Sequence, residues 1–245
     1  AMLLNVPRVR GAVALSGSIA YVPQRPFILN QTVRNNVIFG EQFDAARYKR
    51  VLRACSLRAD LDVLPRGDQT EIGERGINLS GGQKQRVSIA RAAYADADVV
   101  LMDDCLSAVD AHVGKHIFER CICELMQGKT RVLASNQLQY LPRADTVVFV
   151  ENGTVAFTGT FRELMSQQGS ALADVFREHI GDGDGAGRTA HVSDAAAFGA
   201  GIDELAAVGE SLRASALSSS SSRLYYSATA SSAGGGRAYL GVPSS

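Results

Sequence analysis

The sequence INLSGGQKQRVSIARA (residues 77–92) places one serine and two glycines immediately before a helical pattern. Ser80 can cap that helix, and Gly81 and Gly82 allow a ligand to approach the backbone closely. The first amide groups of a helix have no intrahelical partner and carry the positive end of its dipole, which favours a bound phosphate. A capped turn without a ligand is the alternative. No G-x-x-x-x-G-K-[S/T] phosphate loop occurs in the 245 residues.

The composition is that of a globular chain without charge bias. Of the 245 residues, 46% are hydrophobic and 20% are charged, which suffices for a sizeable core. The 25 basic and 25 acidic residues give zero formal net charge, so composition gives no case for a nucleic-acid partner or an anionic membrane surface. Apolar runs such as VVLM (99–102) are far shorter than the ~20 residues that a membrane-spanning helix needs.

Cysteine and histidine spacing favours structural roles over metal binding. Because the cysteines lack C-x-x-C spacing, we expect reduced structural thiols in a cytosolic setting. His112 and His116 have the spacing for a shared metal on one helix face, but no third ligand is evident and we expect a solvated face. The four cysteines are Cys55, Cys105, Cys121 and Cys123.

The chain divides in composition near residue 181. Residues 1–180 alternate strand-like and helix-like segments, which is typical of an α/β domain with a largely parallel sheet. From 181 to 245, Gly, Ala and Ser dominate and apolar periodicity is lost, so we expect a disordered linker. Within it, residues 202–217 have loosely helical spacing that allows a transient or partner-bound helix.

Periodicity and turn signals predict individual elements. The run DVVLMDD is continuously apolar up to its acids, as a buried parallel strand is. The pattern predicts neighbouring strands at 11–15 and 17–23, helices at 44–56, 83–94 and 111–126, strands at 98–104 and 130–135, and a hairpin over 146–159 that turns at Asn152-Gly153.

Asp103 and Asp104 end the strand predicted at 98–104. That position lies at the carboxyl edge of the sheet, where α/β sheets bind ligands. Adjacent carboxylates there suit Mg²⁺ held through water beside nucleotide phosphates. A strand-terminal helix cap is the alternative.

Four motifs in order resemble the nucleotide-binding domains of ATP-binding cassette (ABC) transporters. LSGGQKQR (79–86) resembles the family signature, and VVLMDD (99–104) resembles its Walker B strand. SAVD (107–110) resembles its D-loop, and YVPQ (21–24) ends in a glutamine similar to that of the Q-loop. A narrower resemblance is to the first such domain of a multidrug-resistance-associated (C subfamily) transporter. It rests on the stretches GSIAYVPQRPFILNQTVRNNVIFG, DDCLSAVD and NQLQYLPRAD.

The resemblance covers about residues 8–180 and implies a P-loop NTPase-like (ABC ATPase) core. That core has a parallel sheet and a helical signature subdomain, and it binds ATP and Mg²⁺. The family's Walker A loop would lie upstream of residue 1, so we expect an ABC domain over 1–180 that is incomplete at its N-terminus. The 181–245 segment would be the linker that follows it.

For the local nucleotide, the resemblance implies Gln24 as the Q-loop residue, Asp104 as a degenerate Walker B acid and Asn136 at the switch-histidine position. Asp103 and Gln24 would contact Mg²⁺ indirectly. Asp104 stands where the family has Glu, and a shorter carboxylate would polarise an attacking water poorly. Asn136 can donate a hydrogen bond to phosphate but carries no charge. The resemblance therefore implies slow turnover at the local site.

A second set of residues would serve the nucleotide of a partner domain. In the family, two nucleotide-binding domains pair head to tail, and the signature of one covers the γ-phosphate held by the other. The implied contacts in trans are Leu79, Ser80, Gly81, Gly82 and Gln83, and the D-loop that couples the two sites is Ser107, Ala108, Val109 and Asp110.

Taken as a whole, the resemblance implies the ATP-hydrolysing module of a membrane exporter. Its partners would be a second nucleotide-binding domain and the transmembrane domains of the same transporter, which Phe27 and Ile28 would approach at the cytosolic face of a plasma or organellar membrane. No nucleic acid is expected, and membrane association would occur only through the transmembrane domains.

Two alternatives stay open. The chain could be a truncated fragment or interaction module without independent ATPase activity, and for the isolated chain we expect none. A soluble ABC ATPase of DNA repair or translation shares the signature. Those proteins carry long coiled coils or basic arms, which this compact and neutral sequence lacks.

Overall fold

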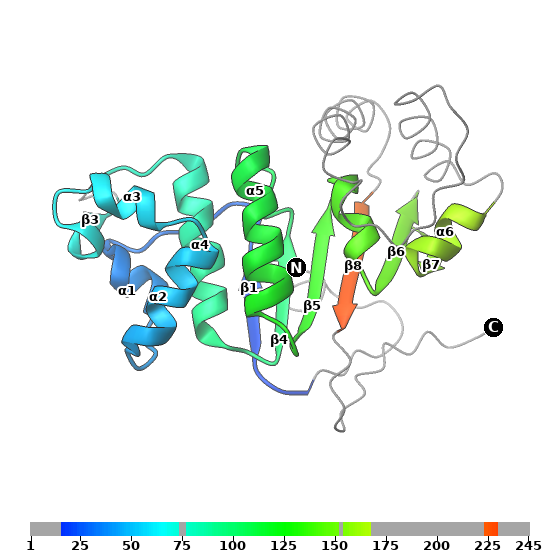
Figure 1. Ribbon diagram of the computed structural model, residues 1–245, viewed down its shortest axis with the longest axis horizontal. Coiled ribbons are helices and arrows are strands. Elements are labelled where there is room, and N and C mark those ends of the chain that lie inside the picture. The colour runs from blue at the N-terminus through cyan, green and yellow to red at the C-terminus, as the bar shows by residue number, and fades with distance from the viewer. Residues whose placement is uncertain (1–15, 74–76, 152–153, 168–222, 230–245) are drawn as a thin grey trace.

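A computed structural model describes residues 16–73, 77–151, 154–167 and 223–229. The main feature is a six-stranded sheet, drawn in Figure 1. Its strands, in spatial order, are β1 (Ile19–Val22), β4 (Val99–Asp103), β5 (Thr130–Ser135), β8 (Arg223–Thr229), β6 (Thr146–Glu151) and β7 (Thr154–Gly159).

β4 lies between β1 and β5 and is parallel to both. Val99 is opposite Ile19 on one side and Thr130 on the other. The first four residues of β4 are all buried, which is why this strand has no polar alternation in its sequence. The predicted α/β class and the strands at 17–23, 98–104 and 130–135 are confirmed. The strand predicted at 11–15 lies outside the described residues.

β6 and β7 form the predicted hairpin, paired antiparallel from Val147 opposite Gly159 to Glu151 opposite Thr154. The predicted turn at Asn152-Gly153 falls outside the described residues, as does the helix predicted at 202–217. β8 was not predicted, because it lies in the Gly-, Ala- and Ser-rich segment 181–245, which was expected to be a linker. It pairs antiparallel with both β5 and β6, and thus lies between two strands that run parallel to each other (Figure 1).

A group of helices lies beside β1 (Figure 1). α2 lies within the helix predicted at 44–56. Asp44 caps it by accepting from the amides of Ala46 and Arg47, and its face formed by Tyr48, Val51 and Leu52 is buried. The members of the group are α1 (Val33–Ile38), α2 (Ala45–Ala54), α3 (Arg58–Val63), η1 (Gly67–Gln69) and α4 (Gly81–Ala95), with the two-stranded sheet β2 (Gln31–Thr32) and β3 (Glu71–Ile72).

The helix predicted at 111–126 is present but changes pitch. α5 (Ala111–Ile117) has α geometry and continues as the π-helix η2 (Phe118–Leu125). The buried guanidinium of Arg131 on β5 donates to the carbonyl oxygens of Ile122 at 2.6 Å and Cys123 at 3.2 Å. A π turn frees carbonyls from the usual ladder, and Arg131 satisfies two of them inside the core.

Three of the cysteines lie in the core, and all four are free thiols. The Sγ atoms of Cys55 and Cys121 are 3.6 Å apart. Burial raises the pKa of the Cys105 thiol, so this side chain stays protonated and unreactive. The described residues contain no group of three His, Cys, Asp or Glu side chains that could hold a metal ion. His116 Nε2 lies 3.1 Å from the Arg53 carbonyl oxygen, and His112 is exposed.

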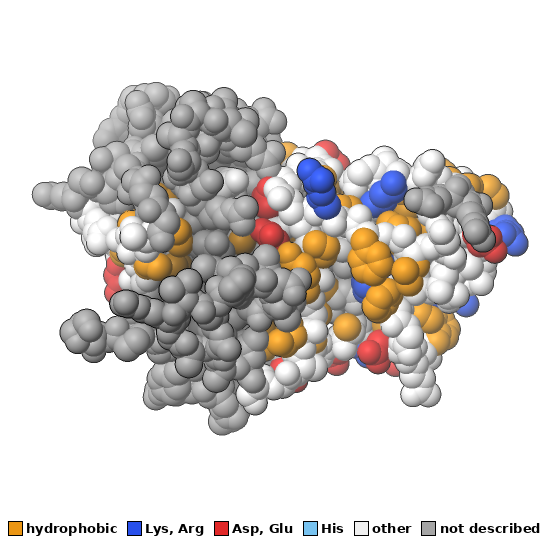
Figure 2. All heavy atoms as spheres, turned by 180° about the vertical axis from the view of Figure 1, so that it is seen from behind, with side chains coloured by type: hydrophobic (Ala, Val, Ile, Leu, Met, Phe, Trp, Pro, Cys, Tyr) orange, Lys and Arg blue, Asp and Glu red, His pale blue; other side chains and the backbone are white. Residues whose placement is uncertain are grey.

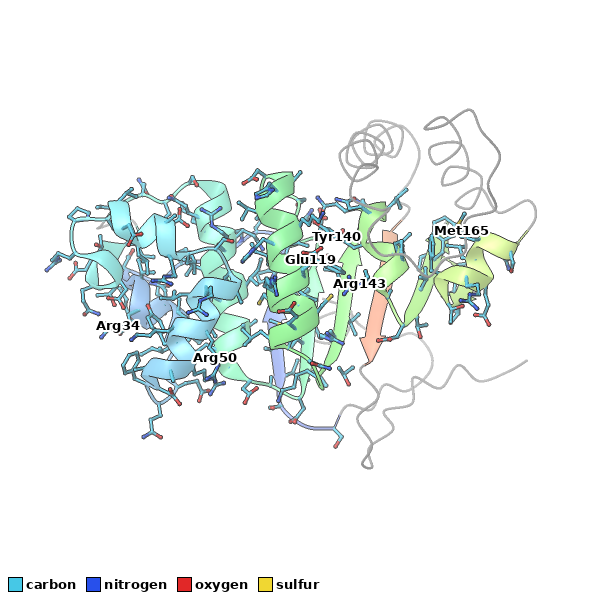
Figure 3. The ribbon with its side chains drawn as sticks, in the orientation of Figure 1. Arg34, Arg50, Glu119, Tyr140, Arg143 and Met165 are labelled. Atoms are coloured by element: carbon cyan, nitrogen blue, oxygen red, sulfur yellow. The ribbon has the colours of Figure 1, made fainter. Side chains whose placement is uncertain are left out.

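Two further short helices complete the described fold: η3 (Leu138–Arg143) and α6 (Phe161–Ser166). Tyr140 of η3, labelled in Figure 3, stacks on Phe118 with ring centroids 4.2 Å apart. Burial raises the pKa of the Tyr140 phenol to about 12. This stack joins the segment after β5 to the π-helix.

Asn36 on α1 organises the loop that follows β1. Its side chain has no exposed surface, accepts from the Leu29 amide at 2.8 Å, and donates to the carbonyls of Leu29, Gln31 and Thr32. Arg91 of α4 donates to both the carbonyl and the side-chain oxygen of Asn36. One buried amide therefore fixes the loop, α1 and α4 relative to one another.

We predict that Asn36→Ala lowers the free energy of unfolding by about 2–3 kcal/mol, because several buried backbone groups lose their partner. The neighbouring Asn35 is exposed, so Asn35→Ala is the matched control and should change stability far less. Urea unfolding monitored by circular dichroism measures both. Equal midpoints for the two variants would show that the Asn36 network contributes little.

Candidate functional site

The carboxyl ends of β1, β4 and β5 meet at one edge of the sheet. Val22 is opposite Met102, and Asp103 is opposite Ala134, so the residues that follow these strands emerge side by side. Gln24 follows β1, Asp104 follows β4 and Asn136 follows β5. The structure thus brings the residues predicted for the local nucleotide to the same edge, where parallel sheets bind ligands.

Asp104 is the buried acid of this edge, with 8% of its surface exposed. Its backbone has a φ of 44°, and its amide donates to the Ala134 carbonyl at 2.7 Å. Gln24 Nε2 donates to Asp104 Oδ2 at 3.2 Å. The chain therefore bends sharply at Asp104 while its carboxylate stays within reach of Gln24.

Asp103 and Gln24 have the chemistry expected for indirect Mg²⁺ contacts. Asp103 is half-buried and Gln24 is exposed, and both carry oxygen atoms, the ligands that Mg²⁺ prefers. The Tyr21 hydroxyl lies 3.5 Å from Asp103 Oδ2, a long contact. Because these residues supply few direct ligands, they fit an ion whose coordination is completed by water and phosphate rather than a site enclosed by protein.

The start of α4 is the second polar feature. Ser80 caps the helix through a capping box, in which its Oγ accepts from the Gln83 amide at 3.2 Å and Gln83 Oε1 accepts from the Ser80 amide at 2.9 Å. The Lys84 amide donates to the Ser80 carbonyl. These bonds leave the amides of Gly81 and Gly82 for an anion at the positive end of the helix.

The two glycines differ in their surroundings. A Cβ on Gly81 would have no atom within 4 Å, whereas a Cβ on Gly82 would meet the Ala108 carbonyl oxygen at 3.1 Å. Gly81 is therefore open to a ligand, and Gly82 allows the 107–110 loop to approach the helix. Leu79 is buried beneath this start of the helix.

The predicted D-loop connects Asp104 to the start of α4. Ser107 Oγ donates to the Asp104 carbonyl at 2.8 Å, Val109 is buried, and the Ala108 carbonyl oxygen faces Gly82. Asp110 caps α5 by accepting from the Val113 amide at 3.0 Å. This contact within the chain is structural. The role predicted for Asp110 in coupling two nucleotide sites stays a prediction.

Sequence reasoning missed an ion pair that holds the start of α4. Arg86 donates to Asp60 of α3 through Nε and Nη2 at distances from 2.7 to 3.0 Å, and Gln83 Nε2 donates to Asp60 Oδ1 at 3.0 Å. Both charged side chains are mostly buried, at 13% and 16% exposure. Residues this far apart in the sequence give no periodic signal, so only the fold could identify this pair.

An exposed aromatic patch lies on the same helical side of the molecule. Phe27 and Phe39 are 49% and 46% exposed, and their rings meet edge to face at 5.9 Å. The Arg91 guanidinium lies 4.5 Å from both ring centroids. Burial lowers the pKa of Arg91, which nonetheless stays charged at neutral pH. We name Phe27, Phe39 and Arg91 the aromatic patch.

The described surface otherwise mixes residue types. Figure 2 shows hydrophobic side chains in several separate groups on the described part of the rear face, with basic and acidic side chains between them. On α1, Arg34, labelled in Figure 3, pairs with Asp68 at 2.9 Å and lies 4.9 Å from the Phe43 ring centroid. Each helix that the structure describes falls short of the length and apolarity required to cross a bilayer.

Comparisons with known proteins identify the family of this domain. Residues 5–107 match the family described as ABC transporter. The chain is 52% identical to ABC transporter C family member 12 of Dictyostelium discoideum over 166 residues. This alignment covers 68% of this chain and 12% of that protein. The chain is 48% identical over 185 residues to ATP-binding cassette sub-family C member 2 of Rattus norvegicus, covering 74% of this chain and 12% of that protein.

A nematode relative gives the same result. Multidrug resistance protein mrp-7 of Caenorhabditis elegans is 52% identical over 171 residues, covering 69% of this chain and 11% of that protein. The matched part of this chain thus spans only about 12% of the length of these curated relatives. The chain therefore contains an ABC ATPase domain, similar to those of the C-subfamily (multidrug-resistance-associated) transporters.

Proposed function

We propose that this chain is the nucleotide-binding part of an ABC exporter that couples ATP binding and hydrolysis to transport. The observation that carries the proposal is that one chain bears two different half-sites. One is the pair of glycine amides at the start of α4, and the other is the polar edge formed by Gln24, Asp103, Asp104 and Asn136. ABC domains in general bind ATP with Mg²⁺.

The half-site on α4 serves a nucleotide held by a second domain. Gly81 and Gly82 supply backbone amides, and the capping box fixes Ser80 and Gln83 so that these amides point outward in a defined geometry. Preorganised amides stabilise the charge that develops on a transferred phosphoryl group without reorganising during the reaction. Two other parts of this chain support the surface. Leu79 is buried next to it, and the loop Ser107–Asp110 lies against Gly82.

The local half-site is weaker. Asp104 is the acid that would polarise an attacking water, yet its carboxylate is one methylene shorter than glutamate and is already in contact with Gln24. Asn136 offers a neutral donor at the edge where a charged imidazole would strengthen a phosphate contact. We infer that the local site binds nucleotide and turns it over slowly, whereas the site completed by α4 carries most of the hydrolysis. Mg²⁺ near Asp103 would offset phosphate charge.

The aromatic patch faces the transmembrane domains in this proposal. Phe and Arg are both enriched in protein–protein interfaces relative to the rest of the surface. Phe27 of the patch lies in the loop after Gln24, and Arg91 donates to its carbonyl, so a partner that contacts the patch would sense the state of the local site. The domain would comprise residues 1–180 at the cytosolic face of a membrane. The linker would comprise 181–245, of which Arg223–Thr229 forms β8 in the described structure.

We predict that Gly81→Asp in the transporter lowers ATP turnover roughly 100-fold or more, because a carboxylate would oppose the partner's γ-phosphate. Gly81→Asn is the matched control, since it has the same shape without the charge and Gly81 has space for a side chain. Steady-state phosphate release measures both. Equal losses in the Asp and Asn variants would argue against a phosphate at this helix.

The double variant Asp104→Glu with Asn136→His should raise hydrolysis at the local site roughly 10- to 100-fold, by restoring a longer base and a charged phosphate contact. Single-turnover hydrolysis, with the partner domain's own site inactivated, isolates this signal. The control is Asp62→Glu with Asn35→His, because both control residues are exposed and lie outside the site. An unchanged single-turnover rate would refute the degenerate-site proposal.

Phe39→Ala should weaken binding of the domain to the transmembrane part of the transporter by at least about 10-fold, because a central aromatic anchor is lost. Val155 on β7 is 61% exposed and lies outside the patch, so Val155→Ala is the control. Binding is measured by titration of the purified domain, with thermal unfolding recorded in parallel. If the two variants bind alike, the aromatic patch is not the docking surface.

A further inference from the structure

Gln85 is a buried amide on the helix that carries the signature motif. Its side chain has no exposed surface, although it lies among the polar residues of the first turns of α4. Nε2 donates to the Pro23 carbonyl oxygen at 3.3 Å. Oε1 is buried without a hydrogen-bond partner among the residues that the structure describes.

An apolar side chain of similar shape would pack at this position without an unsatisfied oxygen. The one hydrogen bond that Gln85 makes is therefore the feature that distinguishes glutamine from methionine there. That bond ends on the residue directly before Gln24. Gln24 in turn donates to Asp104 Oδ2 at 3.2 Å.

A second side chain of α4 holds the same loop farther along. Arg91 Nη2 donates to the Phe27 carbonyl at 3.2 Å, and its Nε donates to the Asn36 carbonyl at 2.8 Å. The loop from Pro23 to Phe27 is thus tied to α4 at both ends, with Gln24 between the ties. Of the two ties, Gln85 is the one adjacent to Gln24.

The contacts form a closed ring through the chain. Asp104 leads into the D-loop, whose Ala108 carbonyl lies against Gly82 at the start of α4. From there α4 leads to Gln85, then to Pro23 and Gln24, and back to Asp104. A shift of the start of α4 must therefore displace the Gln24 loop or break the bond of Gln85.

We propose that Gln85 is a positioning residue that links the signature helix to Gln24, so that the two half-sites of this chain respond to each other. This inference rests on the proposed function. Gln85 touches neither nucleotide, and it acts by holding the backbone that places Gln24 against Asp104. Loss of its donor leaves α4 folded and frees the loop.

Hydrogen–deuterium exchange of the full chain tests the positional part. In Gln85→Met and in the shorter Gln85→Asn, the amides of residues 24–32, apart from Pro26, which has none, should exchange about 3- to 10-fold faster, while those of α4 keep their protection. Gln127 is exposed in the turn after η2, so Gln127→Met is the matched control. Unchanged exchange of residues 24–32 in both Gln85 variants would overturn the proposal.

A double-mutant cycle in the transporter tests the functional part. Gln85→Met should lower kcat about 10-fold with little change in KM, and it should have no further effect when Gln24 is already alanine. Additive losses would overturn the proposal, because Gln85 would then act by another route. A wild-type transporter without ATP turnover would refute the proposed function instead, and the exchange experiment would still decide whether Gln85 holds the loop.

Discussion

The parallel pairing of β4 with β1 and β5 is the constraint on which the rest of the candidate site depends. Because the three strands run the same way, Gln24, Asp104 and Asn136 leave them at one edge despite their distance in the sequence. The backbone bends sharply at Asp104, and the loop that follows passes along the start of α4. The segment after β4 therefore connects the edge of the sheet with the helix that carries the signature motif.

These connections give the domain an asymmetric character. The start of α4 is fully organised, with a capping box, a buried ion pair to Asp60 and two amides left for an anion. The sheet edge instead has a short carboxylate and a neutral amide where stronger groups would favour hydrolysis. In the proposed function, a domain built in this way contributes more to the nucleotide of a partner domain than to its own, and α4 links the two half-sites.

Local signals predicted much of the fold. The apolar run of β4, the Ser-Gly-Gly cap of α4 and the face of α2 each specify one element by short-range chemistry, and the acids at the end of β4 marked the site edge. The pairs Asp60–Arg86 and Gln85–Pro23 could not be predicted, because their partners are distant and leave no period in the sequence. Nor could β8, since it lies in a segment rich in Gly, Ala and Ser, and it pairs with β5 and β6, which are distant in the sequence.

In the proposed function, α4 completes a nucleotide site on another domain. Vanadate trapped with Mg²⁺ and ADP cleaves nearby backbone under ultraviolet light, so it reports which residues contact the γ-phosphate position. We expect cleavage of this chain at residues 80–82, and only when a second nucleotide-binding domain with an intact phosphate loop is present. If residues 80–82 are not cleaved, or are cleaved without the second domain, α4 does not complete such a site.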